Sequence, residues 1–187
     1  MDDESRKTRF RINEMATNDY HFVTDWRFEA TREEVYEILS DPLDLSRWWP
    51  EVYLQVDEEE PGEPGGLGRV IKLKTKGFLP YRLHWSFKVT KVDKPKGFSL
   101  EAWGDFVGTG EWTFVQDGKY VMVIYDWKIR ADKPLLQRLS WLLKPVFSSN
   151  HHWAMAKGEA ALRGEIVRRR AADPEKVLVG ALESRAS

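Results

Sequence analysis

The sequence predicts an α+β domain, in which the strands form one antiparallel sheet and the helices lie on one side of it. Three observations support this prediction. Most segments between residues 20 and 130 alternate apolar and polar side chains, which is typical of strands with one buried face. A capped helical segment interrupts the strands early in the chain. A long helical segment follows the last strand, and turn residues separate the strands from one another.

The first strand and the helices after it have clear boundary signals. Apolar side chains alternate with polar ones from Tyr20 to Ala30, which predicts a strand. Thr31-Arg32-Glu33-Glu34 has the pattern of a capping box, and the apolar spacing behind it predicts a helix that ends near Asp41-Pro42. A second short helix is expected from Leu43 to Trp49, closed by Pro50.

Six more strands and a long helix complete the predicted order. The last strand places alternate apolar residues, among them Tyr125 and Trp127, on its inner face. Asp132 can cap the final helix, and Pro145 is expected to kink or split it. The six strands are predicted at 51–57, 69–76, 81–89, 98–103, 108–116 and 119–130.

Composition limits the classes of protein. The length of 187 residues suits one domain at 19–170, with a flexible N-terminal tail at 1–18 and a C-terminal tail at 171–187. A net charge of −1 gives no general attraction to nucleic acid. The absence of cysteine excludes disulfides and thiolate metal sites, and no signal peptide is visible, so a cytoplasmic location is expected. We find no motif for a metal or a cofactor and expect neither.

Nine tryptophans are the most informative feature of the composition. Indole offers a large, rigid apolar surface with one polar N–H, which suits the wall of a cavity for flat or apolar molecules. We therefore expect a hydrophobic small-molecule ligand, with two of the tryptophans near the cavity mouth. The candidate ligand-binding residues are Trp48, Trp49 (these two at the mouth), Tyr81, Trp85, Trp112, Tyr125, Trp127, Asn150 and Trp153.

Several of these segments resemble a known superfamily. The run from Ala30 to Tyr36, continued by Ser40-Asp41-Pro42 and Arg47-Trp48-Trp49-Pro50, is similar to the usual opening of START-like proteins, which include polyketide cyclase/dehydrase-like proteins. The resemblance covers residues 20–168. It implies the helix-grip fold, a curved seven-strand antiparallel sheet around a long C-terminal helix, with two short helices after the first strand.

A narrower resemblance links three further segments to one subgroup of cyclase-like sequences. These segments are 104–112, 125–127 and 145–155. The superfamily resemblance implies a cavity between sheet and helix that holds apolar ligands. It does not by itself imply an enzyme, because many members bind or carry lipids and other hydrophobic molecules.

The pattern of the final helix predicts which of its faces lies on the sheet. A helical wheel gives one arc without charge, and His151 and His152 point away from it, which favours a capping or surface role. Strand parity places His84, Asp126 and Glu111 outside. The cavity is therefore predicted to lack an acid or base, which favours binding over catalysis. The arc contains Val146, Ser149, Trp153, Ala156, Ala160, Gly164 and Val167.

Three alternatives stay open. In a polyketide cyclase or dehydratase, Tyr125 would donate a hydrogen bond to an enolate and the turn residue Asp105 would act as base, or Asp126 if the strand parity were reversed. The apolar segment 135–147 is either a lid over the cavity mouth or an interfacial helix that contacts a membrane transiently. A partner-binding domain would have a filled interior.

Overall fold

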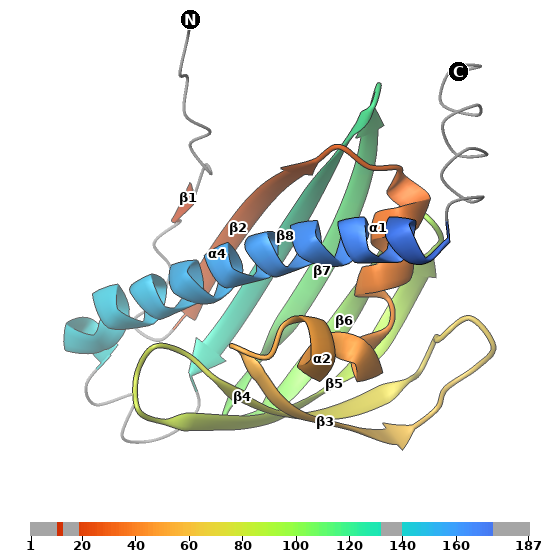
Figure 1. Ribbon diagram of the computed structural model, residues 1–187. Helices are drawn as coiled ribbons and strands as arrows, with labels where there is room; N and C mark the ends of the chain where they lie inside the picture. Colours follow the sequence, from red (N-terminus) through yellow and green to blue (C-terminus); the bar gives the residue numbers. More distant parts are fainter. Residues whose placement is uncertain (1–10, 13–18, 132–139, 174–187) are drawn as a thin grey trace, which may run out of the picture.

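Seven long strands and one short strand form a single antiparallel sheet (Figure 1). The structure, a computed structural model, describes residues 11–12, 19–131 and 140–173. The strands lie in the order β1-β2-β8-β7-β6-β5-β4-β3. They are β1 (Arg11–Ile12), β2 (Asp19–Phe28), β3 (Tyr53–Glu60), β4 (Val70–Lys76), β5 (Arg82–Asp93), β6 (Gly97–Gly104), β7 (Phe106–Asp117) and β8 (Tyr120–Ala131). The predicted seven-strand sheet is confirmed, and β1 adds a two-residue strand paired with β2.

The helices follow the predicted order. After β2 come α1 (Arg32–Leu39), a 3-10 turn η1 (Pro42–Asp44) and α2 (Leu45–Trp48). The capping box is confirmed, because the Glu34 N–H donates to Thr31 Oγ1 at 3.2 Å and the Thr31 N–H donates to the Glu34 carboxylate at 2.7 Å. Sequence signals at this helix start were therefore sufficient to place it.

The long helix α4 (Ser140–Ala172) lies across one face of the sheet, with α1 beside its C-terminal end (Figure 1). It is continuous through Pro145, so of the predicted kink or split the split does not occur. The predicted cap at Asp132 and the start of the apolar segment, residues 135–139, lie outside the described residues. No helix in the described ranges is both long and apolar enough to span a bilayer.

The face of α4 that packs on the sheet is nearly opposite to the predicted one. Its buried residues include Met155, Gly158, Leu162 and Ile166, which repeat at helical spacing. The wheel failed because it selected residues without charge, and small side chains without charge can be fully solvated. The residues of the predicted arc that are exposed are Ser149, Ala156, Ala160, Gly164 and Val167.

A buried glutamate on α4 explains why the charge criterion misled. Glu165 is 3% exposed and lies on the packed face. Its carboxylate accepts hydrogen bonds from Arg47 on α2 at 2.6 Å, and from Arg168 and Arg169 on its own helix at 2.7 and 2.8 Å. Burial by itself raises the pKa of Glu165, but these arginines outweigh it and hold the pKa well below its ordinary value. This cluster ties α2 to α4.

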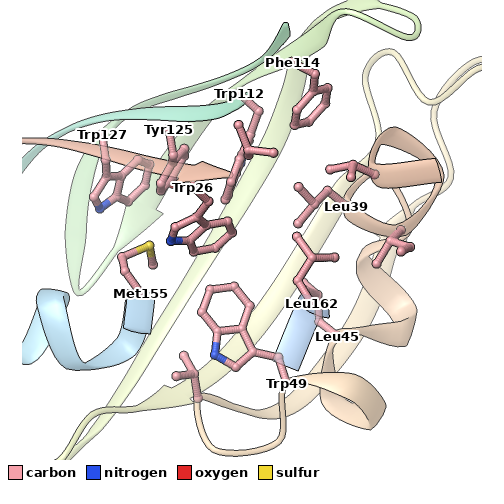
Figure 2. Close-up of a cluster of buried hydrophobic side chains, with 14 of the residues drawn as sticks. Trp26, Leu39, Leu45, Trp49, Trp112, Phe114, Tyr125, Trp127, Met155 and Leu162 are labelled. Carbon is pink, nitrogen blue, oxygen red and sulfur yellow. The ribbon is translucent and has the colours of Figure 1, made fainter. Parts of the chain in front are cut away.

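Beside this cluster the space between α4 and the sheet is filled with apolar side chains (Figure 2). Trp49 is 1% exposed, and its ring lies 6.1 Å from Trp26 and 5.1 Å from Tyr53. Gly158 lets α4 approach this indole, because a β-carbon at that position would overlap the Trp49 ring. With Leu162 these residues close one end of the interior.

Candidate ligand-binding cavity

At the other end, α4 and the sheet line a partly open cavity of about 140 Å³. Its wall comes from β2, β5, β7 and β8, from the start of β3 and the end of β4, from the turn between β6 and β7, and from the N-terminal half of α4. Six of the nine predicted ligand-binding residues lie in this wall. They are Tyr81, Trp85, Trp112, Tyr125, Trp127 and Asn150.

Strand register builds the aromatic part of the wall. Trp112 on β7 stands directly opposite Tyr125 on β8, and their rings stack at 4.0 Å with planes 14° apart. Trp127, two residues further along β8, stacks on Tyr125 at 5.6 Å (Figure 2). Trp85 from β5 lies 6.0 Å from Trp127. Gly110, opposite Trp127, leaves room for the indole to lie over the strand, because a β-carbon there would stand 2.9 Å from its ring.

The volume decides what size of molecule fits. Ligand pockets for drug-sized molecules usually measure about 300–1,000 Å³, whereas an apolar cavity of about 150 Å³ holds a benzene molecule. At about 140 Å³ the cavity has room for one ring with a small substituent. Its presence contradicts the filled interior expected of a pure partner-binding domain.

Three predicted residues lie outside the cavity wall. Trp48 and Trp49 stack on each other at 5.5 Å and are 6% and 1% exposed, so they belong to the packed end and not to the mouth. Trp153 turns toward the loop between β4 and β5, where its ring lies 6.5 Å from Phe78. Its assignment followed from the wrong face of α4.

Asn150 connects α4 to the same loop. Its side-chain oxygen accepts the backbone N–H of Phe78 at 3.0 Å. Gly77 allows this contact, because a β-carbon at that position would overlap the Asn150 amide. Asn150 therefore fixes the edge of the cavity as well as lining it.

His151, predicted to point away, instead lies in the cavity wall. Its ring stacks on Phe22 of β2 at 4.1 Å with planes 15° apart, and Nε2 lies 3.4 Å from Thr24 Oγ1. Burial, with a smaller contribution from His152, lowers the pKa of His151 to about 3. The imidazole is therefore neutral at physiological pH.

Asp105 also lies in the wall, between β6 and β7. Its carboxylate accepts the backbone N–H of His84 at 3.0 Å, and its own N–H donates to the His84 carbonyl at 3.0 Å. With His151 and Asp105 present, the prediction that the cavity lacks an acid or base is wrong. The predicted outward position of Asp126 is correct, because it pairs with His21 at 3.0 Å and Lys128 at 3.2 Å. The reversed-parity alternative is thereby excluded.

Four tyrosines supply most of the remaining polar surface of the wall: Tyr20, Tyr53, Tyr81 and Tyr125. Burial raises the pKa of each, so all four stay protonated. Sequence analysis did not include Tyr20, Phe22 or Phe106 in the site. Tyr20 and Phe22 could have been found, because both lie on the inner parity of the first predicted strand.

Comparisons with solved structures show the same fold. The aromatase/cyclase Zhui from Streptomyces sp. R1128 is 18% identical with a TM-score of 0.65, covering 83% of this chain and 98% of that one. Protein TTHA0849 from Thermus thermophilus is 16% identical with a TM-score of 0.63, covering 78% and 98%. A point mutant of norcoclaurine synthase from Thalictrum flavum, in complex with a transition-state analogue, is 15% identical with a TM-score of 0.58, covering 84% and 99%.

Sequence comparison assigns the family. No curated protein matches the chain. The family described as polyketide cyclase/dehydrase and lipid transport matches residues 20–165, which include β2 from its second residue, every strand from β3 to β8 and most of α4. The resemblance drawn from the sequence is therefore confirmed, and the chain belongs to the polyketide cyclase/dehydrase and lipid transport family.

Proposed function

We propose that the protein binds a small hydrophobic molecule with a flat ring or a short acyl group in the cavity between α4 and the sheet. The observation that carries the proposal is a wall of stacked rings around unfilled space, next to a region where similar rings pack against one another. The family description, which names cyclases, dehydrases and lipid transport, is consistent with a hydrophobic ligand.

The size of the cavity narrows the ligand class. A ring-sized molecule fits without rearrangement, whereas a long polyketide or lipid chain requires more than about 140 Å³. To make room for such a ligand, α4 and the loop between β4 and β5 would have to move away from each other. This movement would break the Asn150–Phe78 hydrogen bond and the ring contact between Trp153 and Phe78.

The test is to fill the cavity. Ala154 lies in the wall, and Ala154→Leu adds three carbons to it. Ala156 is exposed on the same helix, so Ala156→Leu is the matched control. Toluene is titrated into each protein, and binding is measured by the rise in melting temperature. Toluene should bind the parent, and it should bind Ala154→Leu at least tenfold more weakly. Ala156→Leu should bind as the parent does. Equal binding by Ala154→Leu would place the ligand elsewhere.

The natural ligand is sought separately. Native mass spectrometry of freshly purified protein detects a co-purified small molecule as added mass. We expect that added mass to be absent from Ala154→Leu and present in Ala156→Leu. A mass retained by both variants would not come from the cavity.

A reaction of cyclase or dehydratase type in the same cavity is the second candidate. The observation in its favour is that Asp105 and His151 both face the cavity. His151, with its pKa near 3, is a weak base, so Asp105 would remove the proton and Tyr125 would stabilise the enolate. Acetophenone in D₂O tests this, because enolisation exchanges its methyl protons for deuterium. If the parent protein accelerates this exchange and Asp105→Asn does not, the result would support the hypothesis that the protein is an enzyme.

A further inference from the structure

Two tyrosine hydroxyl groups in the cavity wall differ from several of its other polar groups, because they form no hydrogen bond to the part of the chain that the structure describes. The Tyr20 hydroxyl on β2 and the Tyr81 hydroxyl just before β5 are both buried, and neither has a hydrogen-bond partner within the described ranges. The Tyr20 side chain as a whole is 8% exposed, held between Phe22 and Phe147 at 6.0 and 5.8 Å. The described residues therefore supply no hydrogen-bond partner for either hydroxyl.

Three other polar groups of the wall are already engaged. Thr75 Oγ1 accepts the Trp85 indole N–H at 3.1 Å. The Asn150 amide oxygen and the Asp105 carboxylate each accept a backbone N–H at 3.0 Å. Buried polar groups in folded proteins are nearly always paired, with protein or with water, so two unpaired hydroxyls on residues of a cavity wall are able to bond to a polar group of a molecule bound there.

We propose that the Tyr20 and Tyr81 hydroxyls form a subsite for a neutral oxygen acceptor of the ligand, a ketone or aldehyde carbonyl. The inference rests on the proposed binding function and names the polar part of the bound molecule. A carbonyl oxygen has two lone pairs and accepts two donors at once, while the rest of the ligand stacks on the rings.

The electrostatics of the subsite favour a neutral acceptor. Burial raises the pKa of Tyr20, and burial together with the nearby Tyr20 raises the pKa of Tyr81. Both groups are therefore hydrogen-bond donors at all physiological pH values. The same desolvation disfavours a carboxylate beside them. Lys76 and Asp105 are the oppositely charged side chains elsewhere in the wall.

The experiment compares two probes of the same shape, acetophenone and α-methylstyrene, which differ by C=O against C=CH₂. Dissociation constants are measured for the parent, Tyr20→Phe, Tyr81→Phe and the double variant. Each lost hydrogen bond should weaken acetophenone binding by about five- to tenfold, and α-methylstyrene binding should not weaken. Tyr36→Phe is the control, because Tyr36 is a buried tyrosine outside this cavity.

The outcomes separate the subsite from the proposed function. Loss of acetophenone affinity alone supports the subsite. If both probes bind the parent and the phenylalanine variants change neither or both equally, the subsite is wrong and the binding function stands. If neither probe binds the parent, both proposals fail. The variants should fold, because removing an unpaired buried hydroxyl does not destabilise a protein.

Discussion

The two ends of the space under α4 use the same kinds of side chain with opposite results. At the C-terminal half of the helix, Trp49, Trp26 and Leu162 fill the interior, and Gly158 brings the helix down onto the indole. At the N-terminal half, Trp127 and Tyr125 line a cavity of about 140 Å³. Aromatic content alone therefore does not distinguish a core from a binding site.

The difference comes from what α4 presents at each end. At the filled end it presents glycine and branched aliphatic residues, and the Glu165 cluster with Arg47 holds it against α2. At the cavity end it presents Ala154 and the flat ring of His151, and Asn150 reaches sideways to the loop at Phe78. The short side chain of Ala154 faces large rings and leaves part of the gap, although Met155 of the same helix also lines the cavity.

The largest expected effect is at the filled end. Trp49→Ala should lower the free energy of unfolding by about 3–5 kcal/mol, because it removes a fully buried indole from close packing. Trp127→Ala should lower the free energy of unfolding by less than Trp49→Ala does, because one side of the Trp127 ring already borders the cavity. Trp127→Ala should nevertheless weaken ligand binding more than Trp49→Ala does. Urea unfolding and toluene titration of both variants provide the comparison. Equal stability losses would contradict the distinction between the ends.

Glu165→Gln tests the cluster that anchors the filled end. Loss of hydrogen bonds to three arginines around a carboxylate 3% exposed should cost about 2 kcal/mol. Because the folded pKa lies below the unfolded one, this stability is complete above the ordinary glutamate pKa of 4.5 and is lost as the pH falls below it. Glu159→Gln, which breaks a partly exposed pair with Arg163, should cost under about 1 kcal/mol. A pH-independent cost for Glu165→Gln would contradict this.

His151 gives the cavity end its own pH signature. Its pKa is 6.5 in the unfolded chain and about 3 when folded, so the unfolded state binds more protons between these values. Stability should therefore fall as the pH drops below 6.5, by about 2 kcal/mol at pH 5 at 1.36 kcal/mol per unit. His151→Gln should remove this loss between pH 7 and pH 5 in urea unfolding. His152 is less buried and should contribute less to this loss of stability at low pH. If His151→Gln lost as much stability between pH 7 and pH 5 as the parent does, the burial of the His151 ring would be contradicted.

Two glycines of α4 provide the smallest contrast. Gly158→Ala should destabilise by about 1 kcal/mol, because the overlap with Trp49 exceeds the gain in helix propensity. Gly164→Ala meets nothing within 4 Å and should stabilise by up to about 1 kcal/mol. If the filled end is as close-packed as described, thermal unfolding should show a lower melting temperature for Gly158→Ala and a higher one for Gly164→Ala. A stabilising Gly158→Ala would mean that the helix stands off the indole.

Strand parity and helix capping could be predicted from the sequence, because both depend on neighbouring residues. The capping box at Thr31 and Glu34, the inner face of β8 and the outward Asp126 all followed from local pattern. Five of the nine predicted residues, all on the inner parity of predicted strands, lie in the cavity wall for the same reason; they are Tyr81, Trp85, Trp112, Tyr125 and Trp127.

The orientation of α4 could not be predicted in this way, because its buried face depends on a partner far along the chain. Glu165 looks like a solvent-facing residue until Arg47, 118 positions earlier, is brought against it. This single buried charge displaced the predicted face, and with it His151 and Trp153. The cavity itself depends on the difference between filled and available volume, which no pattern of residue types encodes.

The account depends most on the cavity under the N-terminal half of α4 accepting a ring. A crystal structure of the protein soaked with iodobenzene tests this directly, because iodine scatters anomalously and locates the probe. We predict one iodine position enclosed by Trp127, Tyr125 and Ala154, and none at the packed end around Trp49. Iodine found only on the surface, with rings closed over the cavity, would contradict the account.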